Sequence, residues 1–161
     1  MNYKTTESYF IPKKIESQNI TNKQHYWKYV KIKNAWLDAV CFFMRSGNAS
    51  GYRTIRITSV RKLLLDYGNL VGGAKPLMDA IVKMGHLVDD SPKHSHQIYE
   101  QRKKARGEEE GTLIEFVEPV LSKKERVLKL LKEQPDISTR KAAKIVGCAN
   151  SFVHKMKCSL K

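Results

Sequence analysis

The most informative stretch of this chain runs Asp66-Tyr67-Gly68-Asn69-Leu70-Val71-Gly72-Gly73-Ala74-Lys75-Pro76-Leu77-Met78-Asp79, with Asp89-Asp90-Ser91 ten residues further on. It places three groups of carboxylates around one lysine in a protein whose net charge is +14. Acidic side chains repel phosphate unless a divalent cation bridges the two, and carboxylate oxygens are ligands that Mg²⁺ prefers. The stretch therefore predicts a magnesium site, and the chemistry it suggests is metal-assisted cleavage of a phosphodiester.

The first acidic group lies where a predicted strand passes into a glycine-containing loop. Asp66 and Asn69 occupy this position, which is common for ligands because strand ends are rigid and open to solvent. An Asx-turn cap is the alternative role for these two residues.

The second and third acidic groups lie on a predicted helix and just after it. Lys75 and Asp79 are four residues apart and so share one helix face, a spacing that is also typical of a surface ion pair. Asp79 interrupts an apolar run, however, where a charge without a partner would be costly. Asp89 and Asp90 are neighbours in an extended segment, so we expect only one of them to face the site.

The composition favours a nucleic acid as the partner. The chain has 161 residues, of which 41% are hydrophobic, and a pI near 9.7. That excess of positive charge suits a polyanion, although a merely solubilising surface is the alternative. No run is long and apolar enough to span a membrane, and the N-terminus lacks the apolar core of a signal peptide. We therefore expect a nucleic-acid-binding protein of the cytoplasm.

The charge is uneven along the chain and predicts two units. Residues 121–161 hold 11 Lys/Arg against 3 Asp/Glu, whereas the first 120 residues hold 19 against 13. The run Glu118-Pro119-Val120-Leu121-Ser122 is a plausible boundary between a domain at 1–118 and a module at 121–161.

The first unit is predicted to be an α+β domain with the element order β-α-β-α-β-β. Apolar spacing predicts that its first helix buries Val30, Leu37, Cys41 and Met44 on one stripe, with Ile32, Trp36, Val40 and Phe43 beside it. The predicted elements are a short extended piece at 9–12, a polar loop at 19–24, a helix at 26–45, a strand at 54–58 that runs on toward 65, a helix at 73–84, and strands at 96–102 and 112–116 joined by a charged hairpin turn at 106–111.

The second unit is predicted to be all-α. Helices are expected at 122–132, with a buried face of Val127, Leu128, Leu130 and Leu131, at 140–146, and from a cap at Asn150 or Ser151 to Leu160. Ala143, Gly147, Val153 and Met156 stand at the positions that a helix-turn-helix requires. A plain helical hairpin used for dimerisation is the alternative.

The remaining polar clusters offer weaker candidates. His94 and His96 lack a third ligand of fitting spacing and are interpreted as loop or phosphate-contact residues. The chain has no Walker loop, no GxSxG motif and no Cys/His nucleophile constellation.

At these residues the chain resembles the RusA family of Holliday junction resolvases, over most of residues 9–118. The aromatic-basic segment Asn19…His25-Tyr26-Trp27-Lys28, the segment Lys33-Asn34-Ala35-Trp36 and the acidic stretch quoted above carry the resemblance. It implies a homodimeric, Mg²⁺-dependent endonuclease that makes paired symmetric nicks in four-way DNA junctions. It also implies metal ligation by Asp66 and Asp90, with Lys75 as the catalytic lysine.

One departure from the family pattern bears on the metal site. The second aspartate of the family's Asp-x-Asp-Asn signature falls on Gly68, which has no side chain to ligate a metal. Either Asp79 or Asp89 completes the metal shell, or the protein binds junctions without cutting them well. A non-catalytic DNA-binding protein, such as a phage regulator acting through the helix-turn-helix, is therefore the alternative function.

Basic residues in both units are candidate DNA contacts. The third helix of the second unit offers lysines rather than Arg, Asn or Gln, and lysines mostly reach phosphates, so we expect affinity without much sequence discrimination. The candidate contacts are Lys28, Arg61, Lys75, Arg140, Lys141, Lys144, Lys155 and Lys157.

Overall fold

The computed structural model of the chain describes residues 3–19 and 26–159. The chain divides into two compact units, Tyr3–Glu118 and the segment from Pro119 onward, and each has a hydrophobic core of its own. The polar loop expected at 19–24 falls mostly on residues outside the described part, as does His25 of the aromatic-basic segment.

The first unit is a mixed α+β structure, which confirms the predicted class. A short helix that was not predicted occupies the glycine-containing stretch after Asp66. Its elements are β1 (Tyr3–Ile11), α2 (Tyr26–Met44), β2 (Arg53–Arg61), α3 (Tyr67–Gly73), α4 (Lys75–Lys83), β3 (Ser95–Lys103) and β4 (Gly111–Pro119).

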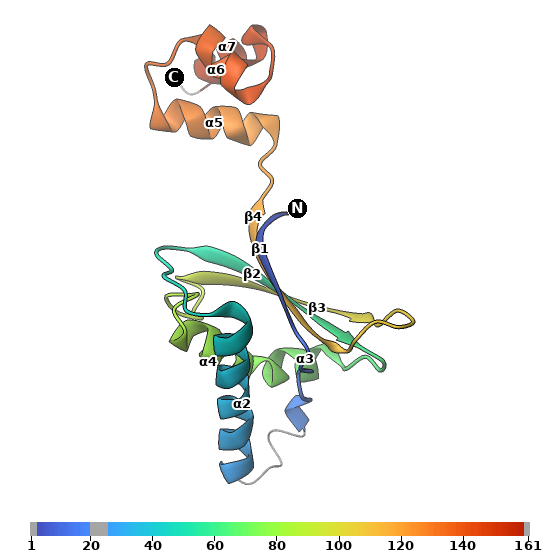
Figure 1. The fold of residues 1–161 in the computed structure, drawn as a ribbon. Coiled ribbons are helices and arrows are strands. Elements are labelled where there is room, and N and C mark those ends of the chain that lie inside the picture. Colours follow the sequence, from blue (N-terminus) through green and yellow to red (C-terminus); the bar gives the residue numbers. More distant parts are fainter. Residues whose placement is uncertain (1–2, 20–25, 160–161) are drawn as a thin grey trace. The chain divides into compact units, whose positions relative to one another are not determined.

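The four strands form one sheet in the order β1-β4-β2-β3. β2 runs antiparallel to β4, with Ile57 opposite Ile114, and parallel to β3, with Ile57 beside Tyr99. A parallel pair needs a crossover connection, and α3 and α4 supply it between β2 and β3. Helices α2, α3 and α4 lie on the same side of the sheet (Figure 1).

The prediction that β3 and β4 form a hairpin is wrong, because β2 lies between these two strands in the sheet. The connecting loop is also not simply solvated. Glu108 accepts hydrogen bonds from Arg102 and from the backbone N–H of Ala105, and Glu110 accepts one from the backbone N–H of Lys62 at 2.7 Å. The acidic loop is therefore tied back to its own sheet.

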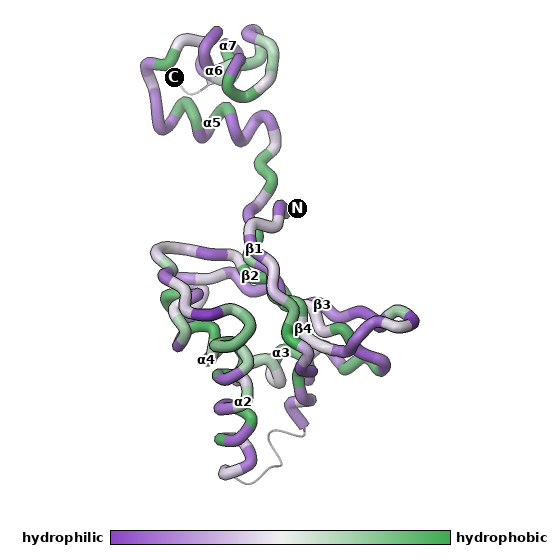
Figure 2. Tube along the Cα trace, viewed as in Figure 1, coloured by the Kyte–Doolittle hydropathy of each residue, from purple (hydrophilic) through white to green (hydrophobic). Residues whose placement is uncertain are grey.

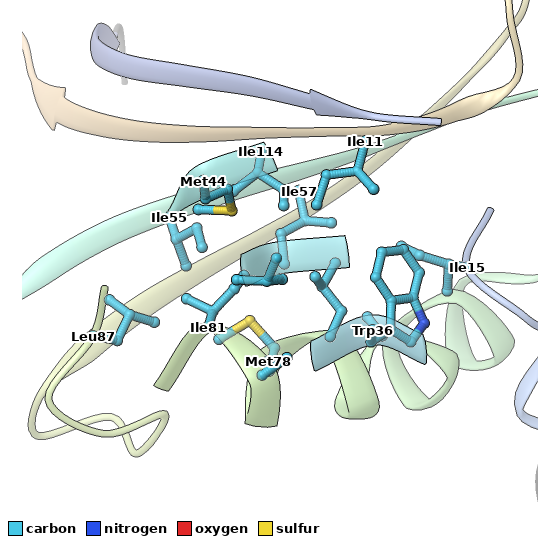
Figure 3. Close-up of a cluster of buried hydrophobic side chains, with 14 of the residues drawn as sticks. Ile11, Ile15, Trp36, Met44, Ile55, Ile57, Met78, Ile81, Leu87 and Ile114 are labelled. Carbon is cyan, nitrogen blue, oxygen red and sulfur yellow. The ribbon is translucent and has the colours of Figure 1, made fainter. Parts of the chain in front are cut away.

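The core of the first unit fills the space between the sheet and the helices (Figure 3). Helix α2 packs against α4 and buries Trp36, Val40 and Met44, which lie four residues apart. The stripes predicted for this helix are therefore only partly right, since Cys41 and Phe43 are exposed.

Two segments near the acidic stretch differ from the sequence prediction. β2 ends at Arg61 rather than continuing through the leucines that follow; Leu63 is exposed and its carbonyl accepts a hydrogen bond from the Arg61 guanidinium. Residues 67–73 form α3 instead of a loop. Gly73 is required at its end, because a Cβ there would lie 1.8 Å from the carbonyl oxygen of Glu16.

The second unit is a cluster of three short helices, α5 (Lys123–Glu133), α6 (Thr139–Val146) and α7 (Asn150–Cys158). Ser122 and Glu125 form a capping box at the start of α5, and Ser138 caps α6 through the backbone N–H of Lys141. Gly147 ends α6 in the left-handed conformation, with φ of 70°. The cap predicted at Asn150 or Ser151 is wrong, since Ala149 precedes α7 and offers no side-chain cap.

The second unit has a small hydrophobic core, which is built from the apolar faces of its helices. Along α5 hydrophobic and hydrophilic residues alternate (Figure 2). Leu128 lies outside the buried cluster that this helix contributes to. The buried residues are Val127, Leu131, Ile137, Ala142, Ala143, Val146 and Val153. In neither unit is any described helix long and apolar enough to cross a membrane.

Candidate active site

Lys75 lies at the centre of a chain of alternating charges. Its ammonium nitrogen contacts Oδ2 of Asp90 in a short ion pair and Oδ1 of Asp79 at 3.0 Å. The second oxygen of Asp79 contacts the ammonium nitrogen of Lys33 at 3.0 Å. This series of ion pairs, Lys33–Asp79–Lys75–Asp90, therefore links α2, α4 and the loop before β3 through side chains of opposite charge.

Helix α4 places the two central members of this chain. Lys75 is its first residue and Pro76 follows it, at a position where the missing backbone N–H of proline costs no helical hydrogen bond. One turn later Asp79 projects on the same face. The ion pair that the i,i+4 spacing suggested is therefore present, but Asp79 is also held by Lys33 from another helix.

The loop before β3 gives Asp89 and Asp90 different partners. The Asp89 carboxylate accepts a hydrogen bond from the backbone N–H of Asp90 at 2.8 Å, and its pKa is lowered by hydrogen bonds from Ser91 and from that N–H. Asp90 turns toward Lys75 instead. The side-chain amide of Gln97 donates to the backbone carbonyl of Asp90 at 2.5 Å and holds this turn from β3.

The electrostatics favour the charged forms of Lys33, Lys75 and Asp79. The hydrogen bond to Asp90 raises the pKa of Lys75 well above its ordinary value, with partial burial opposing it. Burial raises the pKa of Asp79, but the hydrogen bonds from Lys75 and Lys33 outweigh it and lower that pKa overall. The hydrogen bond to Asp79 also raises the pKa of Lys33. Lys75 is therefore a permanent cation rather than a proton acceptor at neutral pH.

Lys75 and Asp90 line a pocket of about 460 Å³. Tyr99 on its wall donates a hydrogen bond to Gln97 at 2.6 Å, and burial together with the charge of Asp90 raises its pKa to about 12. The lining residues are Gln18, Tyr29, Val71, Gly72, Lys75, Met78, Asp90, Gln97 and Tyr99. The pocket thus combines aromatic walls with one cation and one carboxylate.

Asp66 and Asn69 lie at the start of α3, whose later residues Val71 and Gly72 line this pocket. Asp66 precedes the first residue of α3, is exposed and makes no capping hydrogen bond, which speaks against the Asx-cap alternative. Asn69 is half-buried within the helix. No contact joins Asp66 or Asn69 to Lys75 or Asp90 among the described residues.

Gly68 lies in the same turn and faces open space. A Cβ added there would meet no atom within 4 Å. An acidic side chain at this position would therefore find room.

The described residues contain no compact cluster of metal-ligating side chains. Among residues 3–19 and 26–159, no three His, Cys, Asp or Glu side chains gather at one point that would hold a metal ion. Mg²⁺ needs fewer, because it commonly retains several waters and takes one or two carboxylates together with substrate phosphate. Asp66 makes no side-chain capping hydrogen bond, and the Lys75 ammonium contacts Oδ2 of Asp90 rather than Oδ1. The Asp79 carboxylate forms ion pairs with two lysines, and the Asp89 carboxylate accepts a backbone hydrogen bond, so both are less available to bind a metal ion.

The candidate DNA contacts fall into two groups. Lys28, Arg140, Lys141, Lys144 and Lys155 are exposed. Arg61 instead donates to the carbonyls of Leu63 and Ile15, and Lys157 donates to the carbonyl of Ile137 at 3.0 Å. The side chains of Arg61 and Lys157 thus donate hydrogen bonds to backbone carbonyl groups, which leaves them less available to a phosphate.

Sequence reasoning missed Lys33, Tyr29, Gln97 and Tyr99. Gln97 and Tyr99 are two residues apart in β3, so their side chains lie on one face of that strand. The alternation of side chains along a strand could have indicated this from the sequence. Lys33 had no such signal, because its role depends on the packing of α2 against α4.

Comparisons of this chain with family models, with curated proteins and with solved structures found no match.

Proposed function

We propose that the unit Tyr3–Glu118 is a Mg²⁺-dependent, structure-selective endodeoxyribonuclease of RusA type, which resolves four-way DNA junctions by paired nicks. The observation that carries this proposal is the contact of Lys75 with Asp90, at a pocket that both residues line, and with Asp79 on its own helix. These contacts bring the lysine and two of the acidic groups of the sequence signature together. Perturbed, charge-paired groups in a pocket are typical of active sites, although structural ion-pair networks also produce them.

Lys75 would act on the phosphate as a fixed positive charge. Its raised pKa keeps it protonated, and its side chain is about half exposed, so it can exchange a carboxylate for a phosphate oxygen. Such a preorganised cation stabilises negative charge that develops on the scissile phosphate. Asp79 and Lys33 would hold it in place during that exchange.

Asp66 and Asp90 are the residues that would hold Mg²⁺. Bound there, the ion would supply activation of the attacking water and neutralisation of charge on the phosphate. Asn69, one turn after Asp66 on α3, would orient a phosphate or a water through its amide.

The segment from Pro119 onward would act as a helix-turn-helix. Support comes from Gly147 in the left-handed conformation between α6 and α7 and from Val153 in the core behind α7. The exposed basic residues of α6 and α7 would contact phosphates and raise affinity for all DNA alike.

The protein would work as a homodimer, because a four-way junction offers two symmetric strands and a twofold enzyme presents two matching sites. Size-exclusion chromatography with light scattering would report a dimer in the presence of junction DNA. A monomer under that condition would remove this part of the proposal.

The test is cleavage of a synthetic four-way junction in Mg²⁺. We expect wild-type protein to nick it and Asp90→Asn and Asp66→Asn to lose the activity. Asp89→Asn is the matched control, because its carbonyl oxygen still accepts the backbone hydrogen bond from residue 90 and its side chain does not contact Lys75. Wild-type rates in both Asp66→Asn and Asp90→Asn would refute the metal-site assignment.

A second candidate function is non-catalytic DNA binding through the three-helix unit. Gly68 favours it, because the position is empty where the family signature has an acid. Wild-type protein that binds junctions tightly but never nicks them in Mg²⁺ would select this function.

A further inference from the structure

Two large aromatic side chains at the start of α2 are exposed although the unit has a well-filled core. Tyr26 is 67% exposed and Trp27 is 66% exposed. Their rings contact each other edge to face, with centroids 5.5 Å apart. The only other tryptophan, Trp36, is fully buried on the same helix. Exposure of such side chains forfeits burial energy and marks a surface for an interaction.

The surroundings of this aromatic pair are basic. The first turn of α2 contains no acidic residue, and Lys28 and Lys31 are exposed on the same part of the helix. Aromatic rings interleaved with lysines are the combination that proteins use to bind unpaired nucleic acid, since the bases stack on the rings and the lysines follow the backbone. The charges thus complement a polyanion rather than a second copy of this basic chain.

Tyr26 also shares a helix face with two residues of the candidate active site. Tyr29 comes one turn after Tyr26 on α2 and lines the pocket that contains Lys75 and Asp90. Lys33, another turn along the same face, contacts Asp79 of the charge chain. The rise of an α-helix is about 1.5 Å per residue, so Tyr26 lies only about 5 Å along the helix axis from the pocket residue Tyr29.

We propose that Tyr26 and Trp27 form a stacking platform for unpaired bases of a DNA strand whose phosphates enter the pocket at Lys75. This inference rests on the proposed function and narrows it, because it makes unpaired bases at a branch point, rather than continuous duplex, the feature that is recognised. In a continuous duplex the bases are stacked on each other and cannot reach the rings. At a branch or in a single strand they can.

Tryptophan fluorescence tests the platform without requiring cleavage. The measurement uses the full-length Asp90→Asn protein without Mg²⁺, so that it reports binding even if the protein is not a nuclease. The probe is an oligothymidylate of about 16 nucleotides, the upper end of common site sizes. A blunt duplex of equal nucleotide concentration is compared with it. We expect the single strand to quench the exposed Trp27 strongly and the duplex to quench it little, while the buried Trp36 contributes a constant signal.

Substitutions separate stacking from charge. Trp27→Ala is expected to weaken oligothymidylate binding about tenfold, within the range measured for loss of one base–aromatic stack, and Trp27→Phe should retain most of the affinity. The matched control is Phe42→Ala on the same helix, a side chain that is 79% exposed but lies in a last turn without basic residues. It should leave the affinity unchanged.

Three outcomes would overturn the proposal. They are equal quenching by single strand and duplex, unchanged affinity in Trp27→Ala, and a Trp27 signal that changes with protein concentration but not with DNA. The last would show that the rings pack against a second copy of the chain. Junction cleavage that fails while oligothymidylate still quenches Trp27 would refute the nuclease and leave the platform standing.

Discussion

The two units of this protein use positive charge in different ways. In the α+β unit basic side chains are paired with acids, as in Lys33–Asp79, Arg53–Glu7, Arg56–Glu115 and Arg102–Glu108. In the three-helix unit the one described ion pair joins Lys129 and Glu133, at 3.9 Å and between exposed side chains. An ion pair holds its two side chains in defined positions, whereas an exposed charge without an ion pair is available to contact a binding partner. The first arrangement suits chemistry at a defined point and the second suits binding along a phosphate backbone.

The largest effect is expected from removing the central paired charge. Lys75→Met should lower the rate of junction cleavage about 10²- to 10³-fold, the usual result of losing one preorganised stabilising group, with junction affinity changed little. Single-turnover kinetics and a separate binding titration would measure the two quantities. Lys75→Arg controls for charge, and a wild-type rate in Lys75→Met would show that the ion-paired lysine has only a structural role.

The three-helix unit should respond to charge removal in binding rather than in rate. Replacing Arg140, Lys141, Lys144 and Lys155 with glutamine removes four exposed charges, and each lost phosphate contact lowers the slope of log K against log salt by about 0.9. We expect the slope to fall by about 3 to 4 for every duplex tested. Lys129→Gln, which removes a paired lysine from α5, is the control and should change it less.

A selection from random DNA sharpens the same point. If the quadruple variant lost one tight consensus sequence instead of general affinity, α7 would be reading bases and the comparison between the units would need revision.

Gly68→Asp tests whether an acid is missing from the α+β unit. The position is open and lies in the first turn of α3, where a negative charge is favourable. We expect Mg²⁺ to support cleavage at about tenfold lower concentration, the scale on which groups around a metal site act. Gly68→Asn has the same shape without the charge and should not show the gain. A Mg²⁺ requirement that is identical in both variants would mean that position 68 does not face the metal.

The smallest effect is expected on stability, from Asp79→Asn. This change removes two ion pairs between partly exposed groups and should cost about 1 kcal/mol, or about 3 °C in melting temperature. Because the folded pKa of Asp79 is lowered, its contribution is present above pH 3.8 and is lost as the pH falls through that lowered pKa. The melting difference from wild type should therefore vanish in acid. Asp38→Asn, an exposed acid on α2, should show no such difference at any pH.

The sequence predicted what depends on local pattern. Hydrophobic spacing placed α2, α4 and α5 within a residue or two of their bounds, and the expected glycine turn at Gly147 is present. The i,i+4 spacing of Lys75 and Asp79 predicted that they share a helix face.

What the sequence did not predict depends on contacts between distant segments. The helix at 67–73 forms although three of its seven residues are glycines, because its C-terminal end packs closely on Ile15 and Glu16. The parallel pairing of β2 with β3 decides that β3 and β4 are not a hairpin, and no local signal reports it. Lys33 enters the site for the same reason, through the packing of α2 against α4, which are distant in the chain.

The central claim is that Asp66 and Asp90 hold a divalent cation beside Lys75, and paramagnetic broadening by Mn²⁺ tests it most directly. Backbone amide signals of the full-length protein are recorded while Mn²⁺ is added at substoichiometric concentration. The account predicts selective loss of signals near Asp66–Asn69 and around Asp90, and loss of this effect in Asp90→Asn. Broadening centred on the acidic loop Glu108–Glu110, or spread evenly over all exposed acids, would contradict it.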